Sequence, residues 1–310
     1  MKLDPEISCP LRRKVSERTR REFIFTSLGA FAATALYGAA PDGEKPLVRF
    51  AIVSDTHYAD HDSTRPPGEV RAFRESPRKL RECVEVMNAR RPDFIMTLGD
   101  FIEATGPLAR DFESLEHIEK ELAAFDGPRY HVIGNHDFEA FTRADYLSRV
   151  VNTGIPPDRS YYSFVRGGVT FLALDHGYDA DGRPFGRGFA PWNRGHLSEE
   201  EFAWARETVA SAPGPVVVFA HWRLDSKGKG GNAALDAARL RGILEDGGKV
   251  RAVFTGHDHY GYCGVEKGIL YYSLKAMVTG SGPESSSYAE VALYPSGRCS
   301  VTGFRRAKSI

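Results

Sequence analysis

Cysteine is scarce in this sequence. Four of the 310 residues are cysteine, and no two of them form a C-x-x-C pair. This scarcity excludes a disulfide-dense scaffold, a cysteine zinc site and a dithiol redox motif. We expect Cys9 to lie in a removed segment, which leaves room for one disulfide among Cys83, Cys263 and Cys299.

An excess of charge of either sign is lacking as well. The chain holds 41 Lys and Arg residues against 41 Asp and Glu residues, a formal net charge of zero. A nucleic-acid-binding domain would show a strongly basic balance, so no nucleic-acid partner is implied. A small anionic substrate is compatible with this balance if bound metal supplies the positive charge.

The motifs of two large enzyme classes are absent from the sequence. It contains neither G-x-S-x-G nor G-x-x-x-x-G-K-[ST], which argues against a serine hydrolase and a P-loop enzyme. The sequence also shows no internal repeat, no low-complexity run and no linker between domains. We therefore expect one folded domain over residues 41–310.

Residues 1–40 differ in character from the rest of the chain. A basic stretch ends in Arg20-Arg21, an apolar run follows over Phe23–Ala40, and small residues close it. This order resembles a twin-arginine export signal. We expect residues 1–40 to engage the export machinery, to be cleaved near Ala40, and to direct the chain to the periplasm or beyond. The alternatives are an amphipathic N-terminal helix and an uncleaved membrane anchor, since the run has about the ~18 residues that a span requires.

Strand and helix patterns alternate along the remaining sequence. Apolar runs that end in polar clusters predict buried strands. A helix is predicted to begin at Ser76, with Ser76 as N-cap and Pro77 at its first position, and to carry an apolar stripe as far as Met87. In the first half we expect strands over 47–53, 92–98 and 129–133 and a second helix over 115–125. In the second half we expect strands over 161–164, 169–174, 216–219, 250–255, 269–274, 288–294 and 300–304, with helices from 197 and over 233–244. This order predicts right-handed βαβ units, whose ligands gather outside the carboxyl ends of the strands.

Candidate metal ligands follow five of the predicted strands. They are carboxylates, imidazoles and one amide, a set without thiolate that suits Mn, Fe or Zn. Each has an ordinary structural interpretation by itself, such as an N-cap, a turn residue or a core histidine. Because one catalytic metal needs about three protein ligands, so many candidates indicate two metals that share a carboxylate. The residues are Asp55, His57, Asp100, Asn135, His136, Asp137, His221, His257 and His259.

Two of these histidines stand two residues apart, at the end of the strand predicted over 250–255. On an extended backbone, residues i and i+2 point to the same side, so His257 and His259 are expected to face one point in space. Asp258 between them is expected to point away.

Taken in order, the five motifs resemble those of the calcineurin-like metallophosphoesterases. They are Asp55-Thr56-His57, Gly99-Asp100, Gly134-Asn135-His136-Asp137, His221 and Gly256-His257-Asp258-His259. The resemblance implies an α/β fold, a four-layer αββα sandwich of mixed sheets with the metal site at the carboxyl ends of the strands. It implies a dinuclear phosphoesterase in which a metal-bridging hydroxide attacks phosphorus in line.

The resemblance also implies a role for each residue. Asp55, His57, Asp100 and His259 would hold the first of two Mn, Fe or Zn ions. Asp100 would bridge to the second ion, which Asn135, His221 and His257 would also hold. His136 would contact the phosphate and protonate the leaving oxygen, and Asp137 would orient His136.

Shorter segments resemble one branch of the family, which cleaves ADP-ribose and CDP-alcohols with manganese. They are Tyr58-Ala59-Asp60, Phe73-Arg74-Glu75-Ser76, the stretch 138–146, Asn232 and Tyr260-Gly261-Tyr262. That branch tends to carry Gln where this chain has His57. A cyclic-nucleotide phosphodiesterase and a general exported phosphomonoesterase are the alternative activities, and a non-catalytic scaffold with the same fold is a third interpretation.

Arginines and aromatic residues of the predicted loops are candidate substrate contacts. An Arg can fork onto phosphate, and an aromatic ring can stack on a base. The alternative is a solvated arginine or an anchoring aromatic ring. The candidates are Arg71, Arg74, Trp192, Arg194, Trp222 and Asn232.

Overall fold

The computed structural model describes residue 38 and residues 43–61 and 70–310. The strands are β1 (Val48–Val53), β2 (Phe94–Thr97), β3 (Arg129–His131), β4 (Tyr162–Arg166), β5 (Val169–Ala173), β6 (Val216–Ala220), β7 (Val250–Thr255), β8 (Tyr262–Glu266), β9 (Ile269–Ser273), β10 (Ser287–Leu293) and β11 (Cys299–Arg305). The α-helices are α2 (Ser76–Arg90), α3 (Leu108–Leu122), α4 (Asn135–Ala140), α5 (Arg143–Leu147), α6 (Glu199–Ser211) and α7 (Ala237–Glu245).

These strands form two mixed sheets. The first has the order β11-β10-β1-β2-β3, and the second has the order β4-β5-β6-β7-β9-β8. Neighbours β1, β2 and β3 are parallel, as are β5, β6, β7 and β9, while the outer pairs run antiparallel. The carboxyl ends of the parallel strands therefore meet at one edge of each sheet.

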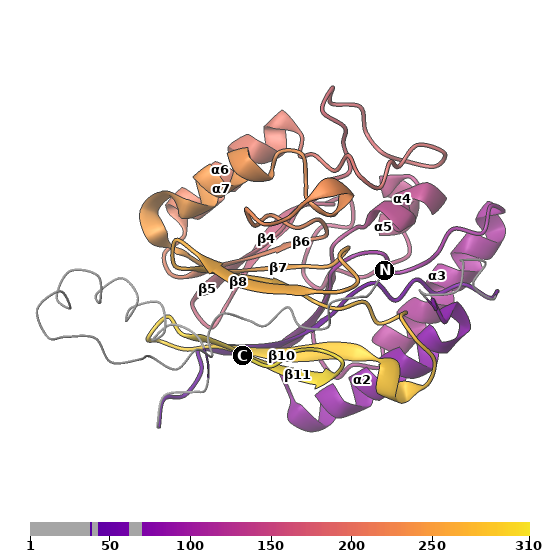
Figure 1. Cartoon of the computed structure of the whole chain (residues 1–310), viewed down its shortest axis with the longest axis horizontal. Helices are drawn as coiled ribbons and strands as arrows, with labels where there is room; N and C mark the ends of the chain where they lie inside the picture. The colour runs from indigo at the N-terminus through magenta and orange to yellow at the C-terminus, as the bar shows by residue number, and fades with distance from the viewer. Residues whose placement is uncertain (1–37, 39–42, 62–69) are drawn as a thin grey trace, which may run out of the picture.

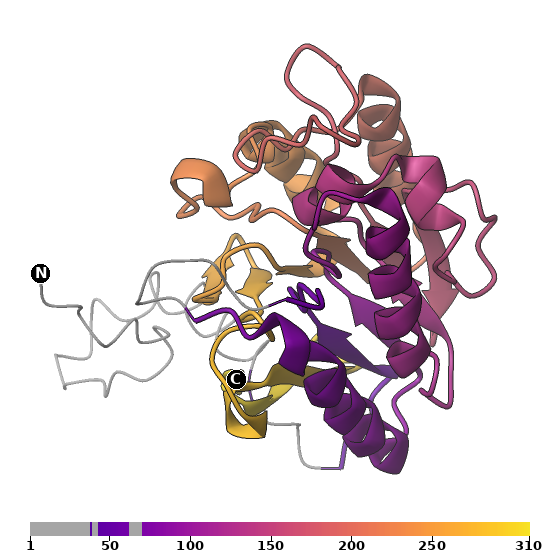
Figure 2. The ribbon, with the colours of Figure 1, turned by 90° about the vertical axis from the view of Figure 1, so that its right-hand side faces the viewer.

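The two sheets pack face to face between two layers of helices. In Figure 1, α2 and α3 lie on the outer side of the first sheet, and α6 and α7 lie on the outer side of the second. Figure 2, turned by 90°, shows α2 and α3 side by side, where Arg81 bonds to Glu121 across the two helices. The α/β class and the four-layer αββα order predicted from the sequence are confirmed.

Phenylalanine rings fill the space between the sheets. Phe50 on β1 stacks on Phe94 of β2 with ring centroids 5.1 Å apart. Its edge meets Phe171, Phe219 and Phe254 of the second sheet at 5.5 Å each. Because alternate residues of a strand face opposite sides, Ala51 and Val53 of β1 pack under the helices instead. Both faces of the central strands are thus buried, which explains their continuous apolar runs.

Several elements differ from the sequence-based expectation. Helix α3 begins at Leu108, seven residues before the expected start, and its first turns place Leu108 and Phe112 against the core. Its start is held by Asp111, which accepts hydrogen bonds from the backbone N–H and the hydroxyl of Thr105. The short helices α4 and α5 and the strand β8 were not expected. They are too short for periodicity to reveal.

Two further expectations concern the N-terminal segment and the cysteine residues. The expected signal segment, residues 1–40, lies outside the described residues except for Gly38. Within the described residues, no helix has the length and apolar character that crossing a membrane requires. No disulfide joins any two of Cys83, Cys263 and Cys299, so none of the open pairings among them is formed.

Candidate metal centre

The expected ligands follow the carboxyl ends of β1, β2, β3, β6 and β7 and meet at one edge of the molecule. Four of them have positive backbone φ angles, with values of 53° at Asp55, 44° at His57, 52° at Asp100 and 63° at His257. Such left-handed conformations are costly for residues with a side chain, and they cluster at functional sites that the surrounding structure holds fixed. These left-handed residues place sharp bends directly after β1, β2 and β7.

A glycine allows two of these strand ends to approach closely. A Cβ atom at Gly134 would overlap the carboxyl group and the backbone nitrogen of Asp100. The backbone N–H of His136 then reaches Asp100 and donates to its Oδ1 at 2.8 Å. This bond fixes the rotation of the Asp100 carboxylate.

Asp55, His57 and His259 form the first cluster of potential metal ligands. Nε2 of His57 and Nε2 of His259 face each other at 3.2 Å. Oδ1 of Asp55 lies 3.4 Å from Nε2 of His259 and 3.8 Å from Nε2 of His57. Three donor atoms of the kinds that divalent transition metals prefer therefore converge on one point.

Asp100, His221 and His257 form the second cluster. Nε2 of His221 lies 3.2 Å from Oδ2 of Asp100, 3.2 Å from Nδ1 of His257 and 3.3 Å from Oδ1 of Asn135. Oδ2 of Asp100 also lies 3.5 Å from Nε2 of His57 in the first cluster. One oxygen of Asp100 is thus within reach of both clusters.

The chemistry of this set fits cations. Burial opposes ionisation of Asp55, yet hydrogen bonding to His259 and His57 holds the pKa of Asp55 below its ordinary range. Burial likewise disfavours the imidazolium of His221, but the adjacent Asp100 raises the pKa of His221 to about 9. The buried carboxylates therefore favour positive charge beside them. A divalent ion can supply this charge in place of the protons on the imidazoles.

His136 sits at the edge of the first cluster, between two carboxylates. Its Nδ1 lies 3.1 Å from Oε2 of Glu139 and 3.3 Å from Oε2 of Glu103. The same Oε2 of Glu103 lies 2.8 Å from Nδ1 of His57. Burial opposes ionisation of Glu103, but this hydrogen bond from His57 lowers the pKa of Glu103 to about 2. Glu103 is therefore ionised at neutral pH and joins a metal-ligand candidate to His136.

Asp137 does not make the contact that the sequence predicted for it. Its Oδ1 accepts hydrogen bonds from the backbone N–H groups of Phe101 and Ile102 at 2.9 and 3.2 Å, and its Oδ2 accepts from Gly134 at 2.9 Å. Neighbouring residues on a helix point in different directions, whereas residues three apart share a face. In α4 it is therefore Glu139, three residues after His136, that reaches the imidazole, and Asp137 ties together the loops after β2 and β3.

His257 and His259 also differ from the first expectation of one shared point. The positive φ at His257 breaks the extended path, so the two imidazoles enter different clusters. Asp258 lies on the wall of the cavity at this centre, where it accepts a hydrogen bond from Nη1 of Arg223 at 2.6 Å. The ion pair accounts for its structural role.

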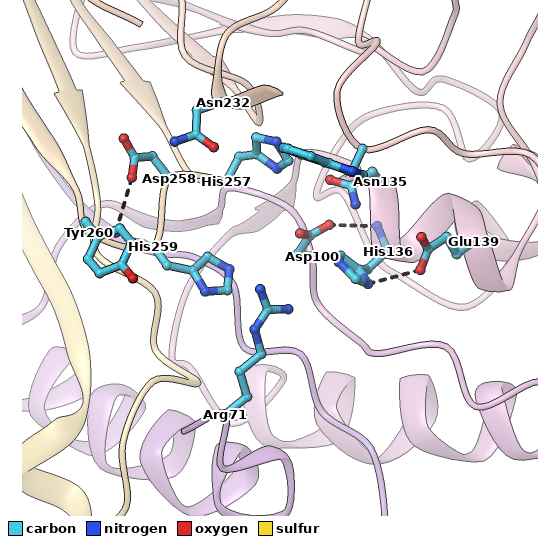
Figure 3. Close-up of a pocket in the computed structure, with 11 residues that line it drawn as sticks. Arg71, Asp100, Asn135, His136, Glu139, Asn232, His257, Asp258, His259 and Tyr260 are labelled. Atoms are coloured by element: carbon cyan, nitrogen blue, oxygen red, sulfur yellow. Dashed lines mark hydrogen bonds and ion pairs between the residues drawn. The ribbon is translucent and has the colours of Figure 1, made fainter. Parts of the chain in front are cut away.

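A cavity of about 420 Å³ opens over both clusters. Figure 3 shows Arg71 reaching in from one side toward His259 and Asp100, with His257 and Asn232 on another. Trp192 and Tyr260 stand at its rim, with 53% and 73% of their surfaces exposed. The lining consists of Arg71, Asp100, Asn135, His136, Glu139, Trp192, Asn232, His257, Asp258, His259 and Tyr260.

Three of the expected substrate residues lie elsewhere. Trp222 is fully buried, and its indole N–H donates to the carbonyl of Trp192 at 2.8 Å. Arg74 pairs with Asp60 at 2.9 Å. Neither Arg74 nor Arg194 is among the described residues that line the cavity. A residue's type and its loop do not indicate which way its side chain points, so a substrate role for these three residues stays a prediction.

Sequence reasoning missed three residues of the site. Glu103 and Glu139 carry the contacts to His136, and Tyr260 extends the rim of the cavity. The available signal was spacing, because each follows a motif residue by one to three positions.

Together, the fold and the site define the class of a two-metal phosphoesterase. Two clusters of carboxylate and imidazole ligands share one carboxylate below an open cavity, which suits two divalent ions acting on a phosphate group. Comparison of the sequence with known families agrees, because residues 48–261 match the calcineurin-like phosphoesterase family. The chain belongs to this family, and it is a metal-dependent hydrolase.

Its relatives include enzymes named manganese-dependent ADP-ribose/CDP-alcohol diphosphatases. The rice protein (Oryza sativa subsp. japonica) is 26% identical, over 81% of this chain and 89% of the relative. The Arabidopsis thaliana protein is 25% identical, over 86% and 96%. Among solved structures, a dimetal phosphatase from Danio rerio superposes with a TM-score of 0.76 at 21% identity, covering 86% of this chain and 98% of that one.

Proposed function

We propose that this protein hydrolyses the diphosphate bond of small nucleotide diphosphate conjugates of the ADP-ribose or CDP-alcohol kind. The observation that carries the proposal is the composition of the cavity. It places a cationic side chain, Arg71, and an exposed aromatic ring, Trp192, beside the two ligand clusters. The negative charge of a diphosphate can pair with Arg71, and the ring of a nucleobase can stack on Trp192. The names of the relatives support the same substrate class.

The ligand roles follow from the two clusters. Two divalent ions, with manganese the first choice, would stabilise the charge that develops on the phosphoryl oxygens and lower the pKa of bound water. Residues that hold the first ion in this proposal are Asp55, His57, Asp100 and His259. Those that hold the second are Asp100, Asn135, His221 and His257.

His136 has the position of the proton donor. Glu103 and Glu139 both face its Nδ1, which leaves Nε2 as the ring atom available to the leaving oxygen of a bound substrate. A protonated imidazole there would donate its proton to that oxygen as the diphosphate P–O bond breaks.

Arg71 would bind the distal phosphate. It is only 7% exposed, and its guanidinium faces the cavity with Nη1 3.9 Å from Oε2 of Glu103. A buried, pre-oriented guanidinium loses little entropy on binding an anion and is well suited to phosphate. A monoester of phosphate lacks the second group that Arg71 would hold.

A substrate panel on the manganese-loaded protein tests the proposal. The panel contains ADP-ribose, CDP-choline, a cyclic nucleotide and p-nitrophenyl phosphate. We expect kcat/KM to be at least about tenfold higher for the two diphosphates. At saturating Mn²⁺, Trp192→Ala should raise KM for ADP-ribose more than KM for p-nitrophenyl phosphate, since only the nucleotide has a base to stack. A preference for the cyclic nucleotide or the monoester would refute the proposed substrate class.

We propose, from Arg20-Arg21 and the apolar run after it, that residues 1–40 act as a twin-arginine-type export signal. The experiment is fractionation of bacteria that express the full chain or the Arg20→Lys/Arg21→Lys variant. Export of the first and cytoplasmic retention of the second are expected. Equal distribution of both would rule the signal out.

A further inference from the structure

His257 is held through both of its ring nitrogens. Its Nδ1 faces the second cluster, 3.2 Å from Nε2 of His221. Its Nε2 lies 3.0 Å from the carbonyl oxygen of Gly231. Because Nδ1 points to the ligand cluster, the proton belongs on Nε2, which donates it to that carbonyl. Metal-binding histidines are commonly oriented in this way by an acceptor on the far side of the ring.

The Trp192 ring covers Gly231. A Cβ atom at position 231 would overlap the six-membered part of that ring, so only glycine lets the indole lie against the backbone. The Trp192 backbone is anchored in turn, because its carbonyl accepts the indole N–H of Trp222 at 2.8 Å. The buried ring of Trp222 lies against His257 with centroids 5.2 Å apart. The two tryptophans and Gly231 therefore enclose the outer side of one candidate metal ligand.

We propose that Gly231 is a positioning residue for the second metal ion. Its carbonyl fixes the orientation of His257, and the Trp192 ring packed on Gly231 holds that carbonyl in place. Affinity at the second metal site then depends on the contact between Trp192 and Gly231, two residues that bind no metal themselves. The inference rests on the metal-binding role of the two clusters and is independent of the proposed nucleotide substrate.

Metal titration of four variants tests this coupling. The full-length chain is stripped of metal and titrated with Mn²⁺ by calorimetry, with free Mn²⁺ followed by electron paramagnetic resonance. Gly231→Ala is compared with Trp192→Ala and with the double variant. Gly242→Ala is the matched control, because that glycine has open space around it and lies in α7 away from the site.

We expect Gly231→Ala to weaken binding of the second ion by about 10- to 100-fold, the usual cost of losing an outer partner of a ligand. Gly231→Ala should bind the first ion with wild-type affinity, and the Gly242→Ala control should bind both ions with wild-type affinity. Trp192→Ala should weaken the second ion by roughly threefold to tenfold, since the carbonyl remains but is less confined. The double variant should bind like Trp192→Ala, because the ring that conflicts with the new Cβ is gone.

Other results would overturn the inference. It fails if Gly231→Ala binds the second ion as the wild type does, or if the Gly231→Ala loss is undiminished in the Trp192→Ala background. If the Gly231→Ala variant does not fold, the Trp192→Ala variant provides the test. Wild-type affinity of Trp192→Ala for the second ion would then overturn the inference. In zinc-loaded protein, which is diamagnetic, the histidine NMR signal of the His257 Nε2–H should shift in Gly231→Ala and return in the double variant.

Discussion

Glu103 is the residue at which three functional groups of the site meet. Its Oε2 bonds to the ring of His57, faces Nδ1 of His136 and lies 3.9 Å from Nη1 of Arg71. A single ionised carboxylate can therefore orient a metal ligand, hold the proton donor and fix the phosphate-binding arginine.

Glu103→Gln tests this role. The amide keeps an acceptor for His57 but removes the negative charge that faces Nδ1 of His136, so we expect two metal ions to remain bound and kcat to fall by about 10- to 100-fold. The loss should be larger for alkyl than for nitrophenyl phosphoesters, because only the poor leaving group needs the proton. Glu139→Gln, whose carboxylate is more exposed, should lose less. Equal losses on both substrates would contradict the assignment.

At the scale of elements, Glu119 connects helix α3 to the strand that leads into the site. Its Oε1 accepts from Nε of Arg129 at 2.9 Å, and its Oε2 lies 3.2 Å from Nε2 of His131. Both partners are on β3, whose end precedes the ligand Asn135. Burial opposes ionisation of Glu119, but the nearby charges of His131 and Arg129 lower its pKa below the ordinary value.

The pH dependence of stability follows from that direction. A carboxyl group whose pKa is lowered by folding stabilises the fold above its unfolded pKa, and this contribution is lost as pH falls through the folded pKa. We expect Glu119→Gln to cost about 1–3 kcal/mol in free energy of unfolding at pH 7, with the difference from wild type shrinking below about pH 4.5. Urea denaturation at several pH values measures it.

Glu116→Gln on the same helix is the control. Glu116 is exposed and pairs with Arg149 at the surface, so its loss should cost no more than about 0.5 kcal/mol at any pH. A difference between wild type and Glu119→Gln that stayed constant down to pH 3 would count against the linkage.

For the whole molecule, the metal centre is also a junction between the two sheets. Each cluster combines ligands that follow strands of the first sheet with ligands that follow strands of the second. An ion bound only by the folded chain stabilises it by mass action, by about 2.7 kcal/mol per site at 100 times Kd. The centre therefore contributes to stability as well as to chemistry.

Metal removal should accordingly lower the thermal unfolding midpoint. We expect the chelated protein to unfold about 5 °C or more below the manganese-loaded protein at saturating metal. Asp100→Ala should abolish most of this difference, because the oxygen within reach of both clusters is gone. Differential scanning calorimetry with and without Mn²⁺ measures it, and an undiminished manganese effect in Asp100→Ala would show that Asp100 does not bridge.

The sequence by itself determined the order of strands and helices and the set of candidate metal ligands. Strand and helix periods alternate clearly, and polar residues such as Asp55, Asp100 and His221 stand directly after apolar runs. Parallel strands bring their carboxyl ends to one edge of the sheet. The position of a polar residue directly after a strand was therefore enough to identify it as a candidate ligand.

Only the tertiary structure decided how the side chains are directed. His257 and His259 separate into two clusters because of one left-handed residue, and Asp137 turns to the backbone while Glu103 reaches His136. The contact of Trp192 with Gly231 joins segments that are distant in the chain. Strand periodicity specifies the faces and ends of strands. The orientation of the side chains is set by the backbone bends after β1, β2 and β7 and by the packing of loops, which depend on contacts that no local pattern records.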